Sequence, residues 1–217
     1  MGKEMKTCLV IGASPAENPR YLLRYCQGDP LVICADGGLA QAAACGIAPS
    51  LAVGDFDSFR GSLPEGLPVL PLDERKDDTD MLAAVHAGLK QGCRRFVLAG
   101  GLGGRLDHSY GNFCVLHFLL SQGCEALLAG EREEAFLVGE GQTRRVACET
   151  GATVSVFPFA CPVCNVSYTG MRYPLDHHDL YSDISRLPMG VSNVVEEQGA
   201  SIAVHRGTAL VIVNLEA

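Results

Sequence analysis

The chain has 217 residues, of which 47% are hydrophobic and 19% are charged, so it is long enough for one large or two small globular domains and is not a disordered protein. Its formal net charge of −8, without a basic stripe, argues against binding to nucleic acid. No apolar run approaches the roughly 20 residues that a membrane-spanning helix needs, so we expect no membrane association. The first residues do not have the pattern of a secretory signal.

The ten cysteines of the chain could form disulfides, but most of them lie in apolar segments, as Cys8, Cys34 and Cys114 do. In such surroundings a free thiol behaves as a small hydrophobic group. A chain of this size also does not need disulfides to fold. We therefore expect reduced thiols and a cytoplasmic protein.

One pair of cysteines, Cys161 and Cys164, has the Cys-x-x-Cys spacing of a metal site. A zinc site needs two more ligands, and the sequence contains no second pair of this kind. His177 and His178 could supply the missing ligands if the fold brought them close. A zinc site is therefore only a minor alternative here.

In chain order, the first part of the sequence alternates strand-like apolar runs with segments of helical spacing. The strand-like runs lie at residues 7–14, 31–36, 50–55, 69–72, 94–101 and 124–130. The helical segments lie at residues 19–26, 38–46, 79–92 and 107–123. This alternation predicts a parallel sheet covered by helices, an α/β domain over residues 1–132.

After about residue 133 the pattern changes to short β-type runs separated by Gly, Asn and Pro. These runs lie at residues 134–139, 143–149, 153–159, 192–197, 201–207 and 209–215. No long helical pattern interrupts them. We therefore expect residues 133–217 to form a smaller all-β domain, a sandwich or a barrel.

Polar stretches follow the predicted strands of the first domain, where the ligands of an open parallel sheet bind. They are Asp36–Gly38, Gly54–Ser58, Lys76–Asp80 and Gly100–His108. Taken one at a time, each stretch could be an ordinary turn or helix cap, since Asp and Thr are favoured in both. All four can converge on one edge of one sheet, and this expected convergence is stronger evidence than any single stretch.

The same edge gathers many carboxylates, which repel one another and would also repel a phosphate. They are Asp36, Asp55, Asp57, Asp77, Asp78, Asp80 and Asp107. A hard divalent cation such as Mg²⁺ reverses this repulsion, because it binds carboxylates and bridges them to phosphates. Lys76 and Arg105 could then donate to phosphate oxygens. The pattern predicts phosphoryl or pyrophosphoryl transfer from a nucleotide.

These motifs together resemble the thiamine pyrophosphokinase (thiamin diphosphokinase) family. The resemblance rests on ADGG (35–38), GDFDS (54–58), KDDTD (76–80), GGLGGRLDH (100–108), RYPL (172–175) and SN (192–193). It covers nearly the whole chain in order and spacing. It implies an N-terminal α/β domain that binds ATP and Mg²⁺, a C-terminal β-sandwich that binds thiamine, and a homodimer whose two active sites are shared between the subunits. In the family reaction, pyrophosphate moves from ATP to the hydroxyl of thiamine, and AMP is released.

The resemblance also implies roles for single residues. The expected Mg²⁺ ligands and catalytic carboxylates are Asp55, Asp57 and Asp80, and Arg105 is expected near the transferred group. The residues expected to bind the nucleotide or its phosphates are Asp36, Gly37, Lys76, Asp77, Thr79, Arg105 and Asp107. Thiamine contacts are expected from Ser192 and Asn193.

Two questions stay open at this point. Some family members place a tryptophan against thiamine, but this chain has none, so an aromatic wall must come from Tyr, Phe or His. The base that accepts the proton of the thiamine hydroxyl could be Asp57 or Asp80.

Other functions fit parts of the pattern. Asp55-x-Asp57 resembles the motif of haloacid-dehalogenase-like phosphatases, with Asp55 as nucleophile, although it does not follow the first strand. A Mg-nucleotide-binding sensor would need the same acidic edge without catalysis. The stretch LDHHD (175–179) looks like a DHH phosphoesterase motif, but it lies in the β-rich part without a preceding parallel strand.

Overall fold

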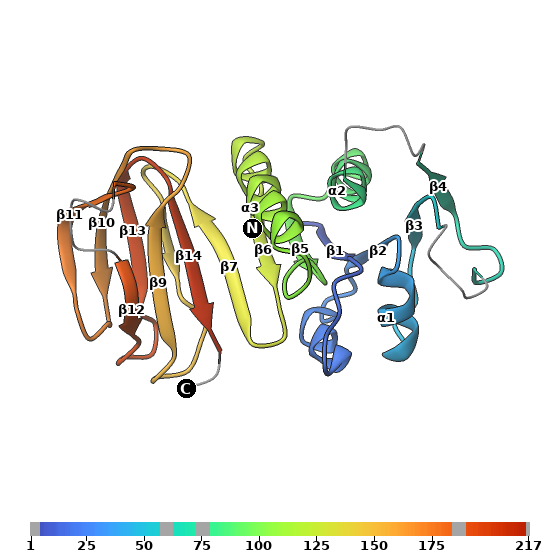
Figure 1. The fold of residues 1–217 in the computed structure, drawn as a ribbon, viewed down its shortest axis with the longest axis horizontal. Coiled ribbons are helices and arrows are strands. Elements are labelled where there is room, and N and C mark those ends of the chain that lie inside the picture. Colours follow the sequence, from blue (N-terminus) through green and yellow to red (C-terminus); the bar gives the residue numbers. More distant parts are fainter. Residues whose placement is uncertain (1–4, 57–62, 73–78, 184–189, 216–217) are drawn as a thin grey trace. The chain divides into compact units, whose positions relative to one another are not determined.

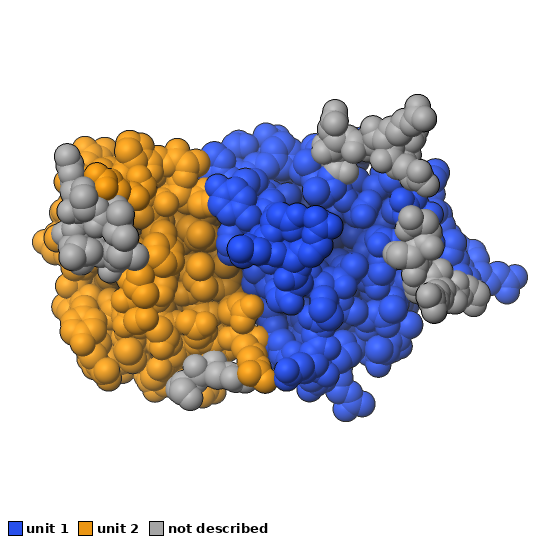
Figure 2. All heavy atoms as spheres, in the orientation of Figure 1, with its two compact units in different colours: residues 1–131 blue, residues 132–217 orange. Residues whose placement is uncertain are grey.

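The structure is a computed structural model of the chain, and it describes residues 5–56, 63–72, 79–183 and 190–215. The chain divides into two compact units, residues 1–131 and residues 132–217, shown in blue and orange in Figure 2. In the described ranges, no helix is long and apolar enough to cross a membrane. The predicted fold class, an α/β part followed by an all-β part, is confirmed.

Unit 1 is built on a parallel sheet (Figure 1). Its described strands are β1 (Thr7–Ile11), β2 (Leu31–Ala35), β3 (Leu51–Gly54), β4 (Val69–Pro71), β5 (Arg95–Ala99) and β6 (Glu125–Ala129). They lie in the order β6-β5-β1-β2-β3-β4, and each neighbouring pair is parallel. The strands β2 to β4 are therefore added in sequence on one side of β1, and β5 and β6 are added on its other side. The edge strand β4 is short, and its residues are exposed.

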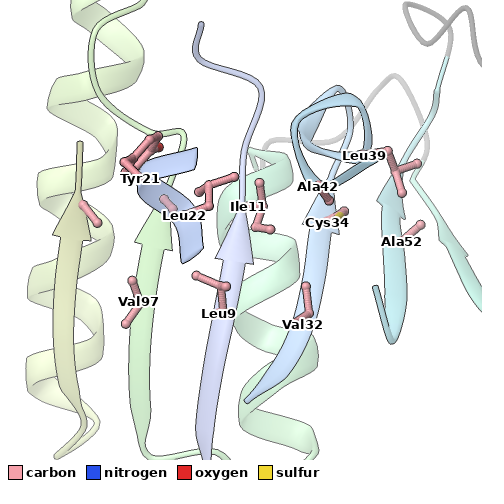
Figure 3. Packing of buried hydrophobic residues seen from close by; sticks show 12 residues of the cluster. Leu9, Ile11, Tyr21, Leu22, Val32, Cys34, Leu39, Ala42, Ala52 and Val97 are labelled. Carbon is pink, nitrogen blue, oxygen red and sulfur yellow. The ribbon is translucent and has the colours of Figure 1, made fainter. Parts of the chain in front are cut away.

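Helices cover both faces of this sheet. The described ones are the 3₁₀ helix η1 (Pro19–Tyr25) and the α-helices α1 (Gly38–Ala44), α2 (Asp80–Lys90) and α3 (Leu106–Ser121). Figures 1 and 3 show η1 and α1 on one face, with α2 and α3 on the other. Because both faces are covered, the strands are almost continuously apolar instead of alternating.

The core on the η1 and α1 side joins residues that are far apart in the sequence (Figure 3). Its labelled members are Leu9, Ile11, Tyr21, Leu22, Val32, Cys34, Leu39, Ala42, Ala52 and Val97. Burying a Leu or Ile side chain stabilises a fold by about 1.5–3 kcal/mol. This layer therefore ties the first three strands to the helices that border the carboxyl ends of the sheet.

The first helical segment differs in type from an ordinary helix. The sequence predicts a helix over residues 19–26, and η1 in that place is a 3₁₀ helix. Asn18 caps it, since its Oδ1 accepts a hydrogen bond from the Arg20 backbone N at 3.1 Å. Tyr21 and Leu22 are its buried residues. Two adjacent buried positions do not make the apolar stripe that would hold a longer α-helix on the sheet.

Glycines allow the loops at the carboxyl end of the sheet to pack backbone against backbone. A Cβ at Gly12 would lie 2.7 Å from the Gly100 carbonyl oxygen, and a Cβ at Gly100 would overlap the Gly12 carbonyl oxygen. Gly38, the first residue of α1, lies against the Ile11 carbonyl in the same way. Gly100 also has φ +65°, a conformation that favours glycine.

Unit 2 is a sandwich of two antiparallel sheets. Its described strands are β7 (Glu133–Val138), β8 (Thr143–Arg145), β9 (Thr153–Pro158), β10 (Val163–Thr169), β11 (Leu175–Tyr181), β12 (Gly190–Val194), β13 (Ser201–Arg206) and β14 (Ala209–Asn214). One sheet has the order β12-β9-β14-β7 and the other β11-β10-β13-β8. Contacts of β9 with β10 and β11, and of β13 with β7, join the two sheets.

Two strands of this sandwich, β10 and β11, are absent from the runs predicted above. In β10, buried and more exposed residues alternate from Val163 to Thr169, and this period of two could have been read from the sequence. β11 has no such signal, because it is a polar edge strand in which Leu180 is its buried residue. The stretch LDHHD is therefore part of an antiparallel edge strand.

The cysteines are free thiols, as predicted. All ten are described, and none of them forms a disulfide. Burial is the main reason why the pKa of Cys164 is raised to about 12, so this thiol is a packing group. Across the described residues, no group of three His, Cys, Asp or Glu side chains could hold a metal ion. Cys161 and Cys164 therefore do not form a zinc site with His177 and His178.

The close packing at Gly38 makes a prediction about stability. We expect Gly38→Ala to destabilise the fold by about 1–3 kcal/mol, because the new Cβ meets the Ile11 carbonyl and α1 must move. Gly111→Ala on α3 is the matched control, since no atom lies within 4 Å of its Cβ position. That change should stabilise by about 0.5–1 kcal/mol through helix propensity. Thermal unfolding of the two variants measures both effects, and equal melting temperatures would contradict the prediction.

Candidate functional site

The strand order of unit 1 reverses between β1 and β5, and the loops after these two strands lie side by side. In doubly wound sheets this is the point at which ligands bind, beyond the carboxyl ends of the strands. The Gly12 backbone N donates to the Ala99 carbonyl at 2.7 Å, and the Ser14 N donates to the Gly100 carbonyl at 2.9 Å. The loop after β1 and the glycine-rich loop after β5 thus form one hydrogen-bonded structure.

Side chains from the covering helices hold these two loops. The Gly100 backbone N donates to the Tyr21 hydroxyl at 2.9 Å, and burial is the main reason why the pKa of Tyr21 is raised. Gln41 on α1 donates from Nε2 to the Gly12 carbonyl at 3.0 Å and to the Ser14 carbonyl at 2.6 Å. The position of each loop is therefore determined by η1 and α1 as well as by the sheet.

Asp36 and Asp55 follow the neighbouring strands β2 and β3. The Asp36 backbone N donates to the Val53 carbonyl at 2.8 Å, and a Cβ at Gly54 would lie 3.2 Å from the Asp36 Cα. Asp36 has φ +45° and is half-buried, and Asp55 is exposed. The fold therefore brings these two predicted positions together, as parallel strand ends require.

Asp80 and Thr79 begin α2. The Thr79 hydroxyl accepts a hydrogen bond from the Leu82 backbone N at 3.3 Å, so this residue caps the helix. Asp80 lies in the first turn, where a carboxylate interacts favourably with the helix dipole. The Met81 side chain approaches the Cβ positions of Gly12 and Gly101 at 2.9 and 3.3 Å. The start of α2 is therefore beside the two joined loops.

Several predicted residues have no described position. Asp57, Lys76, Asp77 and Asp78 lie outside the described residues. Their predicted roles stay predictions. Gly37, by contrast, is described and occupies the N-cap position of α1.

Arg105 and Asp107 form an ion pair at the start of α3. Arg105 Nε lies 3.1 Å from Asp107 Oδ1, and Arg105 Nη2 lies 2.6 Å from Asp107 Oδ2. The hydrogen bond from Arg105 is the first reason why the pKa of Asp107 is lowered, and a hydrogen bond from the His108 backbone N at 2.9 Å adds to it. Both charged side chains are exposed, so the guanidinium can also reach an incoming anion.

The carboxylates at the carboxyl-terminal edge of the unit 1 sheet are of the chemical type that binds a hard divalent cation. Asp36 follows β2, Asp55 follows β3 and Asp80 begins α2, and carboxylate oxygens are ligands that Mg²⁺ prefers. The described residues do not contain a group of three ligands placed to hold a metal ion. The predicted set of Asp55, Asp57 and Asp80 includes one residue outside them.

In unit 2, Asn193 holds the loop between β10 and β11. Its Oδ1 accepts from the backbone N of Tyr173 at 3.0 Å and of Val194 at 2.9 Å, and its Nδ2 donates to the Tyr173 carbonyl at 2.9 Å. Asn193 is buried, and Tyr173 is 63% exposed. The amide of Asn193 therefore fixes the backbone that presents an aromatic ring to the surface.

Ser192 lies next to this clamp at an irregularity in the pairing of β12 with β9. It has φ +60°, and its backbone N donates to the Ser155 hydroxyl at 3.1 Å. Ser192 and its neighbour Val191 are exposed. The predicted pair therefore lies on opposite sides of the strand, since Asn193 is buried and Ser192 is exposed, as for successive residues of a strand.

The residues that hold the joined loops were not among those predicted from the sequence. These are Gly12, Ser14, Tyr21, Gln41 and Asn112. Gly12 and Ser14 lie within the run 7–14 that the sequence predicts as a strand, whereas β1 ends at Ile11. Tyr21, Gln41 and Asn112 had no readable signal, because their role depends on which helix packs beside which loop.

The comparisons with known proteins agree over both units. Residues 22–128 match the family described as thiamin pyrophosphokinase, catalytic domain, and residues 143–208 match thiamin pyrophosphokinase, vitamin B1 binding domain. The thiamine pyrophosphokinase of Bacillus subtilis (strain 168) is 27% identical over 178 residues, which cover 80% of this chain and 83% of that protein.

Solved structures show the same fold. The crystal structure of thiamine pyrophosphokinase from Bacillus subtilis has a TM-score of 0.84 at 21% identity and covers 98% of this chain and 100% of that one. The structure of thiamin pyrophosphokinase from Geobacillus thermodenitrificans has a TM-score of 0.81 at 25% identity, with 97% and 98% covered. The family matches together span most of the chain.

The ion pair of Arg105 and Asp107 predicts a pH effect. Because the pKa of Asp107 is lowered, the ion pair contributes its full stabilisation of the folded state above the unfolded pKa, near 3.9. This stabilisation is lost as the pH falls through the lower pKa of the folded state. We expect Arg105→Gln to raise the pKa of Asp107 towards its ordinary value. Carboxyl NMR titration measures this, with Asp176 as internal control, since its pKa is lowered by His177. An unchanged Asp107 midpoint would show that the pair does not form in solution.

Proposed function

Since the chain belongs to the thiamin pyrophosphokinase family, we propose that it is a thiamine diphosphokinase that moves the terminal pyrophosphoryl group of ATP to the hydroxyl of thiamine with the help of Mg²⁺. The products are thiamine diphosphate and AMP. The observation that carries the proposal is the match of both units to the two domains of this family. The neighbouring carboxylates Asp36 and Asp55 at the ends of β2 and β3 support it.

The thiamine hydroxyl is a weak nucleophile, so the reaction needs alignment and charge neutralisation more than covalent catalysis. In the proposed site, the glycine-rich loop brings backbone N–H groups close to the phosphates, and Arg105 donates to the transferred group. Asp55, Asp57 and Asp80 would hold a divalent cation, which would supply the positive charge that offsets repulsion between carboxylates and phosphates. Asp57 or Asp80 accepts the hydroxyl proton.

The phosphate contacts proposed for Asp36, Gly37, Lys76, Asp77, Thr79 and Asp107 follow from the family resemblance. For two of them the structure adds a second role. Thr79 caps α2, and Asp107 holds Arg105. In the proposal, Asp107 keeps the guanidinium at the entrance of the site until the phosphates arrive.

On the thiamine side, Tyr173 is the aromatic residue that we assign to the wall against the vitamin. It is exposed and rigidly presented, because Asn193 binds both its backbone N and its carbonyl. The thiazolium ring of thiamine carries a positive charge, which an aromatic face attracts. Asn193 then acts by holding Tyr173, and Ser192 offers an exposed hydroxyl beside it.

The proposed assembly is a homodimer with shared active sites. The catalytic carboxylates belong to unit 1, and Tyr173, Ser192 and Asn193 belong to unit 2. A sandwich of this size has a marginal core, which favours burying one of its faces against a partner. A two-fold dimer would cover the exposed rim at Tyr173 and Val191 and close a cleft around thiamine.

The two rival functions of the sequence analysis find no support in the comparisons. Neither a haloacid-dehalogenase-like phosphatase nor a non-catalytic sensor agrees with the family matches of both units. They remain distinguishable by their products, because a phosphatase would form a phosphoenzyme on Asp55 and a sensor would release no AMP.

The direct test is incubation of the protein with ATP, Mg²⁺ and thiamine, followed by separation of the products. We expect thiamine diphosphate and AMP in equal amounts. A chelator should abolish the reaction, and Mg²⁺ or Mn²⁺ should restore it. Asp80→Asn should lower kcat on the order of a hundredfold, because it removes charge at almost constant volume. Formation of ADP or free phosphate instead of AMP would contradict the proposed reaction.

The shared site predicts complementation between two inactive variants. Asp80→Asn damages the unit 1 part of the site and Tyr173→Ala the unit 2 part. When the two proteins are mixed and exchange subunits, each mixed dimer contains one cleft free of both substitutions, so part of the activity should return. Absence of recovery despite demonstrated exchange, or an active monomer in analytical ultracentrifugation, would overturn the shared-site dimer.

A further inference from the structure

A buried amide on α3 holds the glycine-rich loop after β5. Asn112 is 7% exposed, and its Nδ2 donates to the Gly101 carbonyl at 2.9 Å. A Cβ at Gly101 would lie 2.8 Å from this nitrogen. The amide therefore needs a glycine at position 101 in order to approach the loop this closely.

The other end of the same loop is fixed by the first turn of α3. The Arg105 carbonyl accepts from the Ser109 backbone N at 3.1 Å and from the Ser109 hydroxyl at 3.3 Å. The loop from Gly101 to Arg105 is thus attached to one helix at both ends, through Asn112 and through Ser109. Any displacement of Gly101 relative to α3 must change the path of the backbone that leads to Arg105.

This geometry differs from ordinary helix packing. Asn112 is the first buried residue of α3, and the buried apolar residues Val115 and Leu116 follow it one turn later. A buried amide costs stability unless it is hydrogen-bonded, so an apolar residue would suit packing equally well. The contact that distinguishes an amide at this position is the one to the loop.

We infer that Asn112 is a positioning residue for the transfer step. It holds the Gly101–Arg105 loop so that the loop backbone and the Arg105 guanidinium are correctly placed to donate to the transferred group. The inference rests on the proposed function, in which this loop binds phosphates. Asn112 itself does not touch the substrate. Its effect should therefore fall on kcat and depend on Arg105.

The test compares Asn112→Asp with Val115→Ala. The first change keeps the size of the side chain and removes the donor to Gly101. The second, on the same helix, lowers stability through lost packing without changing the contact to the loop. We expect Asn112→Asp to lower kcat on the order of tenfold to a hundredfold, with the KM for thiamine within about twofold of the wild-type value. Val115→Ala should keep kcat near the wild-type value, although its melting temperature should be similar to that of Asn112→Asp.

Two further measurements separate positioning from a structural role. In an Arg105→Ala background, Asn112→Asp should lose most of its effect on kcat, because the two residues act as a unit. Hydrogen exchange of the backbone amides from Gly101 to Arg105 should be faster in Asn112→Asp than in wild type or Val115→Ala. Asn112→Ala serves as a second variant if the Asn112→Asp protein does not fold.

The outcomes decide between the two proposals. If the wild type makes thiamine diphosphate but Asn112→Asp matches Val115→Ala in kcat and in loop exchange, the inference is wrong and the proposed function stands. If the wild type makes no thiamine diphosphate, the proposed function fails and the role in transfer fails with it. Faster hydrogen exchange of the Gly101–Arg105 loop in Asn112→Asp would then support only the statement that Asn112 holds this loop.

Discussion

The contact between the backbones at Gly12 and Gly100 is the constraint on which the rest of unit 1 depends. It lies where the strand order reverses, so it joins the two directions in which the sheet grows. Because neither position can carry a side chain, the loops approach close enough for Gly12 and Ser14 to hydrogen-bond to the end of β5 and the residue after it. The start of α2 and the helix η1 then pack beside this joint through Met81 and Tyr21.

The proposed chemistry depends on where the strands and α2 end or begin relative to the joined loops. Parallel strands end at one edge, so Asp36 and Asp55 become neighbours without any contact between distant helices. Asp80 reaches the same edge because α2 begins there with Thr79 as its cap. In the proposed site these carboxylates are carried by the sheet and by α2, and the cation that the proposal requires would offset the repulsion between them.

The sequence predicted the α/β part well, because apolar strands are local signals, and it correctly placed Asp36 and Asp55 at the ends of neighbouring strands. It did not predict β11, whose polar residues have no alternation to read, and it did not show that Asn193 would bind Tyr173. Nor could it identify Tyr21, Gln41 or Asn112 as residues that hold loops. These side chains look like ordinary members of a helix until the fold brings a specific carbonyl or amide of another segment beside them.

The edge strand β4 has a consequence for behaviour in solution. Its Val69 and Leu70 are exposed apolar residues on the rim of a sheet, which is the kind of surface on which chains add to one another and aggregate. Pro71 ends the strand and has no N–H to donate, and the strand is only three residues long. A foreign strand arriving at this rim would find few hydrogen bonds to form, so β4 is a poor template for the addition of another chain despite its apolar side chains.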